Sequence, residues 1–102
     1  MTLTAAVVLQ AIERGHRYGF ELVDVTGYPT GTLYPALRRL EHAGYLRSAW
    51  ERESAAFNDG RPQRRYYEIT AAGSRALEAA VDQLRVHGAQ SHVRSPKPAR
   101  AR

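Results

Sequence analysis

Residues 29–44, PTGTLYPALRRLEHAG, decide the fold, because their apolar side chains recur with the period of an α-helix. The repeat places three leucines on one face, and two alanines widen it: Leu33, Leu37, Leu40, Ala36 and Ala43. A stripe of this width must be buried against another element. The pattern therefore predicts an amphipathic helix over about 31–43 whose apolar face packs into a core.

Both ends of this helix carry sequence signals. Thr30 or Thr32 can cap the start, because a threonine hydroxyl accepts a hydrogen bond from a first-turn N–H group. Pro35 falls in or near the first turn, where its missing N–H is tolerated. Gly44 is expected to end the helix, since glycine readily adopts a positive φ.

The opposite face of the helix is polar and cationic. It carries hydroxyls near its start and two adjacent arginines: Thr32, Tyr34, Pro35, Arg38, Arg39 and His42. A helix N-terminus favours a phosphate, and arginine forks onto phosphate oxygens or onto a guanine edge. These features favour an acidic polymer as the partner. Taken alone, Arg38 and Arg39 equally fit a solvated helix face.

Two shorter apolar patterns precede this helix. Residues 3–14 fit a helix that Thr4 caps and Gly15 ends, and residues 17–25 fit a second helix before a break at 27–29. A short helix, a glycine-containing turn and a helix with a polar outer face form the helix-turn-helix layout. The pattern alone leaves a small helical bundle as the alternative.

Beyond the helix, the apolar period becomes alternating. Residues 45–53 fit a strand, and RYYEI at 65–69 fits a second one. Asn-Asp-Gly at 58–60 is a strong turn signal between them. We therefore expect a β-hairpin whose arginine-rich loop, about 54–65, forms a wing. A solvated hairpin end is the alternative interpretation of this loop.

A last helix is predicted to start at Ala71, to be capped by Thr70 and to reach about Val86, with Gly73 as a weak point in it. Its apolar stripe has little left to pack on, so we interpret it as a dimer surface, with packing inside the protomer as the alternative. The residues of this predicted surface are Leu77, Ala80, Val81 and Leu84. Residues 88–102 are polar and basic, and we expect them to form a disordered tail.

Length and composition bound the class of protein. A chain of 102 residues has room for one small domain and a tail, and its formal charge of +5 favours acidic partners. It has no cysteine, which excludes disulfides, a thiol nucleophile and thiolate metal sites. No apolar run reaches membrane-spanning length and no signal peptide is evident, so we expect a cytoplasmic protein.

The sequence lacks the signatures of catalysis and cofactor binding. Its four histidines do not share metal-ligand spacing on one element. No nucleophile motif surrounds a serine, and no glycines form a phosphate-binding fingerprint. We therefore predict a protein that is not an enzyme and that uses no cofactor or metal.

The motifs together resemble the PadR family of bacterial transcriptional regulators. The matching words are YGFEL at 18–22, GTLYPALRRLEHAGYL at 31–46, WE at 50–51, GRPQRRYYEIT at 60–70 and AAG at 71–73. They cover about Leu3 to Leu84. The combination of GTLYPALRRLE with GRPQRRYYEIT is specific, whereas either motif alone would be suggestive.

The expected fold is a mainly helical α+β winged helix-turn-helix, with three helices, a two-stranded β-hairpin wing and a C-terminal helix. We expect residues 1–69 to form the DNA-binding domain, residues 70–87 the dimerisation helix and residues 88–102 the basic tail. A single C-terminal helix resembles the small subfamily, whose members dimerise through it. The connection VDVTGYPT at 23–30 is shorter than the family pattern.

The resemblance also implies which residues face DNA. It implies a sequence-specific homodimer, usually a repressor, with the third helix in the major groove and the wing on the backbone or minor groove. The residues carried over are Tyr18, Thr30, Thr32, Tyr34, Pro35, Arg38, Arg39, Arg61, Gln63, Arg64 and Arg65. Trp50, Tyr66 and Tyr67 match aromatic positions that we interpret as structural.

Two questions of partnership follow from the resemblance. Some family members bind an aromatic or drug-like effector between the dimer halves, so an unidentified small-molecule effector is among the partners it implies. No tryptophan or tyrosine follows Tyr67, so we expect no aromatic pocket built from the last helix. The rival functional hypothesis is a winged-helix protein-interaction or dimerisation module without specific DNA readout.

Overall fold

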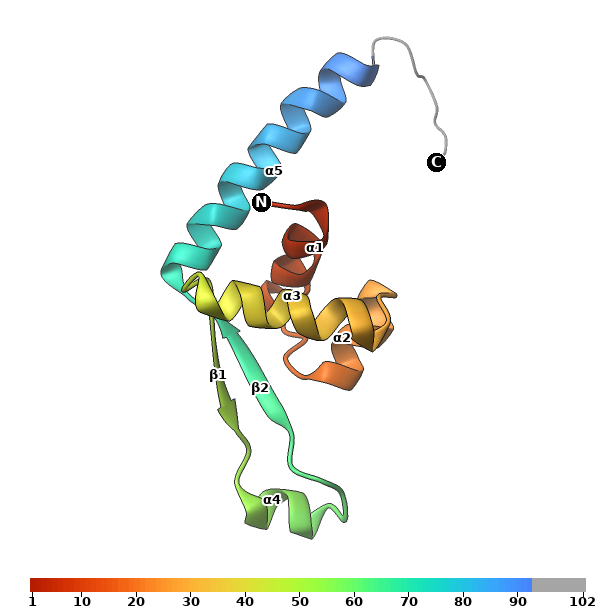
Figure 1. Cartoon of the computed structure of the whole chain (residues 1–102), viewed down its shortest axis with the longest axis vertical. Helices are drawn as coiled ribbons and strands as arrows, with labels where there is room; N and C mark the ends of the chain where they lie inside the picture. The colour runs from red at the N-terminus through yellow and green to blue at the C-terminus, as the bar shows by residue number, and fades with distance from the viewer. Residues whose placement is uncertain (93–102) are drawn as a thin grey trace.

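The computed structural model describes residues 1–92, with side chains as far as Arg85. Its elements in chain order are α1 (Leu3–Glu13), α2 (Gly19–Thr26), α3 (Thr30–His42), β1 (Leu46–Trp50), α4 (Glu53–Asn58), β2 (Arg65–Ile69) and α5 (Ala71–His92). The first three helices form the body, the hairpin projects from one end of it, and α5 extends from the other (Figure 1). This arrangement confirms the predicted winged helix-turn-helix.

Helix α1 is the centre of the core, because α2, α3, α5 and β2 all contact it. Its Val8 and Leu9 are fully buried, as are Leu22 of α2 and Leu33 of α3, and Leu37 is 1% exposed. Full burial of one such side chain contributes roughly 1.5–3 kcal/mol to stability. The predicted leucine face of α3 is therefore its inner face, and its polar side chains point outward.

Threonines cap α1 and α5. The Oγ1 atom of Thr2 accepts a hydrogen bond from the N–H of Ala5 at 3.1 Å, so Thr2 caps α1 and the predicted cap, Thr4, lies inside the helix. The Oγ1 atom of Thr70 accepts one from the N–H of Gly73 at 3.0 Å. The predicted cap of the last helix is thus confirmed.

The start of α3 differs from the prediction. Pro29 occupies the N-cap position, and no side chain caps the helix, because Thr30 and Thr32 already lie within its first turn. Pro35 lies in the second turn, so the carbonyl of Gly31, four residues earlier, has no N–H from Pro35 to accept. The other end agrees with the prediction, since Gly44 follows the helix with φ +82°.

The hairpin is an antiparallel pair of strands. Leu46 pairs with Ile69 at the body, and Trp50 pairs with Arg65 at the far end. The bounds of β2 match the predicted strand, whereas β1 is shorter than the predicted range 45–53.

The loop of the wing holds a helix that the sequence analysis did not predict. Residues 53–58 form α4, where a turn-rich loop was expected. Glu53 stabilises its first turn through the helix dipole, and Ala56 is buried. The predicted turn follows α4, with Gly60 at φ +67°. Its backbone N–H donates to the carbonyl of Phe57 at 3.0 Å and closes the turn.

Helix α5 is longer than predicted and packs on its own protomer. It continues to His92 rather than ending near Val86. Leu77 is 4% exposed within the core, and Val81 packs against it. Packing inside the protomer, the alternative interpretation, therefore applies to Leu77 and in part to Val81, and the dimer surface stays a prediction. Residues 88–92 of the predicted tail 88–102 belong to this helix, so the expected disorder is wrong for them, and residues 93–102 lie outside the described residues.

Gly73 is required by close packing of α5 on the start of the hairpin. A Cβ atom at this position would overlap the carbonyl oxygen of Tyr45 and lie 2.9 Å from Cγ1 of Ile69. The backbone oxygen cannot move aside, since the carbonyl of Tyr45 also accepts the N–H of Thr70 at 3.0 Å. The sequence analysis interpreted Gly73 as a weak point of the helix, but its missing side chain allows this contact.

We predict that Gly73→Ala destabilises the protein. The gain in helix propensity, up to about 1 kcal/mol, is smaller than the cost of overpacking, about 1–3 kcal/mol. Gly31→Ala is the matched control, because nothing lies within 4 Å of the added Cβ atom. Urea unfolding should show a loss for Gly73→Ala and no loss for Gly31→Ala. Equal stability of the two variants would contradict the close contact.

Candidate nucleic-acid interface

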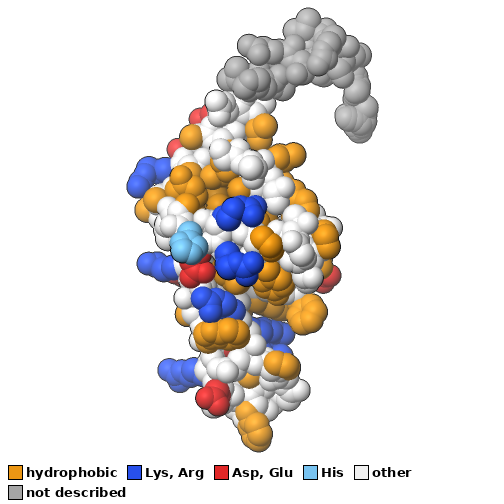
Figure 2. Space-filling model, in the orientation of Figure 1, with side chains coloured by type: hydrophobic (Ala, Val, Ile, Leu, Met, Phe, Trp, Pro, Cys, Tyr) orange, Lys and Arg blue, Asp and Glu red, His pale blue; other side chains and the backbone are white. Residues whose placement is uncertain are grey.

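The outer face of α3 presents charge that no acidic group neutralises. Burial of its leucines turns Thr30, Thr32, Arg38 and Arg39 toward solvent. Neither arginine forms an ion pair with any side chain of residues 1–85. Arginine side chains are spread over this face of the molecule, from the body to the hairpin (Figure 2). The helix therefore offers guanidinium groups that are free to bind an anion.

The start of α2 lies against both α3 and the wing. Tyr18 is the N-cap of α2, and its backbone pairs with Tyr66 in an isolated antiparallel bridge. The rings of these tyrosines meet edge to face at 5.7 Å. Tyr34 of α3 is 40% exposed, and its ring lies so close to Gly19 that a Cβ atom there would be 2.9 Å from Cζ. Tyr18 and Tyr34, the two tyrosines predicted to face DNA, therefore both lie at this junction.

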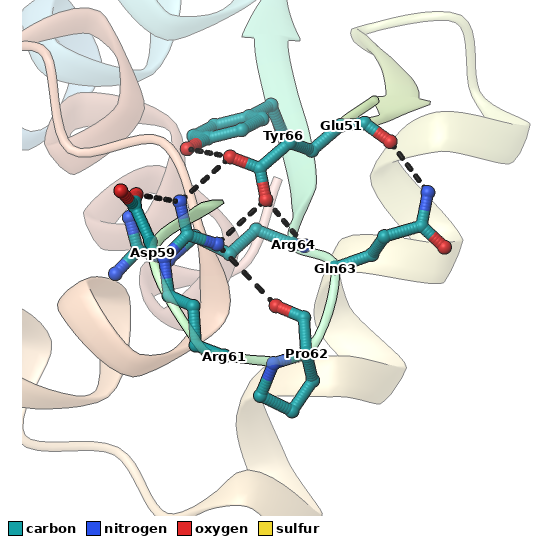
Figure 3. A network of polar contacts seen from close by, with 7 residues as sticks. All are labelled: Glu51, Asp59, Arg61, Pro62, Gln63, Arg64 and Tyr66. Atoms are coloured by element: carbon teal, nitrogen blue, oxygen red, sulfur yellow. Dashed lines mark hydrogen bonds and ion pairs between the residues drawn. The ribbon is translucent and has the colours of Figure 1, made fainter. Parts of the chain in front are cut away.

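Glu51 is the hub of a polar network that shapes the wing (Figure 3). Its side chain is 9% exposed and accepts a two-pronged contact from Arg61, Nη1 to Oε1 at 2.6 Å and Nη2 to Oε2 at 2.8 Å. The backbone N–H of Arg64 and the hydroxyl of Tyr66 also donate to its carboxylate, at 3.2 and 3.3 Å. One carboxylate therefore ties both sides of the hairpin to the segment after α4.

Two predicted DNA contacts are engaged in this network. Arg61 also pairs with Asp59 at 3.0 Å, so two carboxylates share its charge. The Nε2 atom of Gln63 donates to the backbone carbonyl of Glu51 at 2.6 Å. Both side chains therefore bond other residues of the wing and position its loop, a role that the sequence pattern did not indicate.

The bidentate pair shifts the pKa of Glu51. The hydrogen bonds from Arg61 are the largest cause, and they lower the pKa of Glu51 from 4.5 to about 2. The same contact raises the pKa of Arg61 above its ordinary value. Because the folded wing favours the charged carboxylate, its stabilisation is present above pH 4.5 and is lost as the pH falls through about 2.

Arg64 and Arg65 differ in how far their charges are neutralised. The guanidinium of Arg64 lies 4.1 Å from the ring centroid of Tyr18 and has no ion pair among the described side chains. Arg65 donates to Oγ of Ser48 at 3.0 Å and pairs with Glu41 at 3.7 Å. Arg64 is therefore the predicted wing contact whose charge is most available.

Exposed aromatic side chains are the part of this surface that sequence reasoning missed. Trp50 is 61% exposed, although it was interpreted as structural, and Phe20 and Phe57 are both 84% exposed. Trp50 follows the alternation that buries Leu46, but β1 has left the body by that point, so no core covers it. The sequence shows these aromatic residues, but no sequence pattern indicates the point along β1 at which the core ends.

Comparison with protein families gives a match over most of the chain. Residues 8–79 match the model described as the transcriptional regulator PadR-like family. There is no match to a curated protein sequence. The described residues contain no helix long and apolar enough to cross a membrane.

Solved structures with the same fold include regulators named for that family. The smu.1704 protein of Streptococcus mutans is 25% identical, with TM-score 0.74, covering 89% of this chain and 85% of that chain. A PadR family transcriptional regulator of Eggerthella lenta is 29% identical, with TM-score 0.64, covering 89% and 84%. A PadR family regulator of Clostridium difficile is 23% identical, with TM-score 0.73, covering 83% and 90%, and shows likeness of fold.

We predict that Glu51→Gln loosens the wing at neutral pH. The amide keeps the shape of the carboxylate but loses its charge, so the fork to Arg61 weakens. Fluorescence of Trp50, the single tryptophan, reports on the wing. The parent protein should change its signal as the pH falls from about 4.5 toward 2, whereas Glu51→Gln should show the low-pH signal at pH 7.

Glu78→Gln is the matched control for this experiment. Glu78 lies on α5 away from the wing, is exposed and forms no ion pair with any described side chain. It should titrate like the parent protein. Indistinguishable titrations of the parent and Glu51→Gln would show that this carboxylate does not hold the wing.

Proposed function

This chain belongs to the PadR-like family of transcriptional regulators, and we propose that it acts as a homodimeric repressor that recognises a specific duplex sequence. As a member of that family it is a DNA-binding regulator rather than an enzyme. The observation that carries the proposal is the pair of unneutralised arginines, Arg38 and Arg39, on the exposed face of α3. Repression is the action that the resemblance to the family implies.

We place α3 in the major groove. An α-helix fits that groove, and base edges there present a distinct pattern for each base pair. Arg38 and Arg39 provide forked donors for guanine, and the hydroxyl of Thr32 can donate or accept. The start of the helix lacks a side-chain cap, so the N–H groups of Thr30 and Gly31 are directed toward an anion such as a phosphate, whereas that of Thr32 donates to the carbonyl of Pro29 at 2.9 Å. Base reading and backbone anchoring therefore come from one element.

We place the wing on the sugar–phosphate backbone. Arg64 keeps its charge available, and its stacking on Tyr18 fixes the position of the guanidinium beside α2. Arg52, also exposed and without an ion pair among the described side chains, adds a second cation on the wing. Backbone contacts fix register and orientation without reading sequence. The network around Glu51 supports this role because it holds the segment that carries Arg64.

The proposed homodimer rests on an exposed apolar strip along α1 and α5. Met1, Leu3 and Leu84 are between 50% and 63% exposed, and they line a groove of about 250 Å³ together with Ala80. Of the four residues predicted for dimerisation, Ala80 and Leu84 belong to this strip. A second copy would cover these side chains, and two-fold pairing is the commonest way to do so.

Arg38→Ala and Arg64→Ala should separate base reading from backbone anchoring. Binding is measured by fluorescence anisotropy, at two salt concentrations, on duplexes selected from a random pool and on scrambled versions. Arg38→Ala is expected to lower the preference for selected DNA by about 1–3 kcal/mol, because it loses a base contact. Arg64→Ala is expected to weaken binding to both duplexes equally and to reduce the salt slope by about 1.

Arg75→Ala on α5 removes the same charge from an exposed position away from α3 and the wing, and should leave both affinities near the parent values. The selected sequence tests the dimer as well, because a homodimer predicts two inverted half-sites about one helical turn apart. A single half-site would contradict the homodimer. A pool without an enriched sequence would contradict specific readout and favour the protein-interaction module.

A further inference from the structure

Glu41 occupies an unfavourable position for a carboxylate. It lies in the last turn of α3, where the negative end of the helix dipole disfavours an acidic side chain. It is also the only acidic residue in α3, the helix that we propose binds a polyanion. Neither helix stability nor attraction to DNA therefore explains a carboxylate at this position.

Two side chains of the hairpin contact Glu41. Its Oε2 atom accepts a hydrogen bond from Oγ of Ser48 on β1 at 2.6 Å. The same Ser48 oxygen accepts a hydrogen bond from Nε of Arg65 on β2 at 3.0 Å. The Nη2 atom of Arg65 lies 3.7 Å from Oε2 of Glu41. One carboxylate and one hydroxyl thus connect the end of α3 to both strands of the hairpin.

These contacts hold the guanidinium of Arg65 in one place. Its Cζ atom lies 5.4 Å from the centroid of the Trp50 ring, so an aromatic face and the pair formed by Ser48 and Glu41 both restrain it. The side chain of Arg65 is 38% exposed, so a phosphate can still reach it. Among the described side chains, neither Glu41 nor Arg65 forms a second ion pair. The charge of Arg65 is therefore opposed by a single carboxylate.

The pairing of Arg65 matters because a phosphate contact strengthens binding to every duplex, whatever its base sequence. A free guanidinium gains this affinity by releasing counterions from the DNA. A carboxylate beside the guanidinium offsets the positive charge and repels the phosphate. Glu41 thus opposes a backbone contact that Arg65 would otherwise provide.

We propose that Glu41 is a positioning residue that withholds Arg65 from the DNA backbone and so limits sequence-independent binding. The carboxylate acts through Ser48 and Arg65, and the inference rests on the proposed function because it requires the wing to lie on the backbone. Arg64, which stacks on Tyr18 and has no ion pair among the described side chains, remains the backbone anchor of the wing. The protein thereby holds unrelated DNA weakly, although its wing is rich in arginine.

Glu41→Gln tests the proposal, because the amide oxygen still accepts the hydrogen bond from Ser48 while the charge is lost. Fluorescence anisotropy on scrambled duplexes should show tighter binding than in the parent protein at low salt. The slope of log affinity against log salt concentration should steepen by about 0.9, the contribution of one phosphate contact. Between about 50 and 200 mM salt, this slope adds a loss of affinity of roughly threefold to fourfold.

The same substitution in an Arg65→Gln background is the matched control. Because Glu41 is proposed to act through Arg65, the double variant should bind scrambled DNA with the affinity and salt slope of Arg65→Gln alone. A gain of equal size in both backgrounds would mean that the carboxylate only repels DNA at a distance, and it would overturn the proposal. Weaker binding by Glu41→Gln than by the parent protein, the outcome of a purely structural contact, would overturn it as well.

A measurement without DNA separates this proposal from the proposed function. The Nε–H signal of Arg65 in a nitrogen–proton nuclear magnetic resonance spectrum, assigned by its loss in Arg65→Gln, reports on the hydrogen bond to Ser48. Exchange of this proton with water should be faster in Glu41→Gln than in the parent protein, and faster again in Ser48→Ala. An unchanged exchange rate in Glu41→Gln would overturn the proposal. Faster exchange in a protein that binds no DNA would instead contradict the proposed function.

Discussion

The rest of the structure depends on burial of the leucine stripe of α3 against α1. Leu33, Leu37 and Leu40 are each no more than 5% exposed, and each contributes roughly 1.5–3 kcal/mol by leaving water. Rotating α3 would expose these leucines and force Arg38 toward the core, where an unpaired charge is far more costly. The hydrophobic face thus fixes the direction of the polar face, which is the surface that we propose meets DNA.

The wing obeys a different constraint, because little apolar surface is buried beyond the body. Its order comes from one carboxylate, Glu51, which collects donors from Arg61, Arg64 and Tyr66. A forked ion pair with low exposure is a stronger tie than an ordinary surface pair. The network also divides the arginines into those that build the wing and those that stay free. The positive charge available to a partner therefore depends on which arginines form ion pairs within the wing, and not on how many arginines the wing contains.

Sequence reasoning reached the fold because each main element has its own periodicity and boundary residues. The leucine repeat of α3, the bounds of β2 and the Thr70 cap were all readable locally. What failed depended on contacts distant in sequence or on competition between local signals. Leu77 could not be assigned to the core from the sequence, because its burial depends on where α1 lies. The strong turn signal of Asn-Asp-Gly led to the prediction of a loop where the short helix α4 precedes the turn. Likewise, nothing local distinguished Arg61, whose guanidinium is paired with Glu51, from Arg64, whose guanidinium stacks on Tyr18 and has no ion pair among the described side chains.

The central claim is that α3 lies in the major groove while the wing lies beside it on the backbone. The chain has no cysteine, so single cysteines at His42 of α3 and Ala55 of α4 can carry a DNA-cleaving iron chelate without interference. On the selected duplex, we predict cuts from His42→Cys within each half-site, and cuts from Ala55→Cys displaced by about half a helical turn, roughly 5 base pairs. Diffuse cleavage from the α3 position, or coincident cleavage from both, would contradict the account.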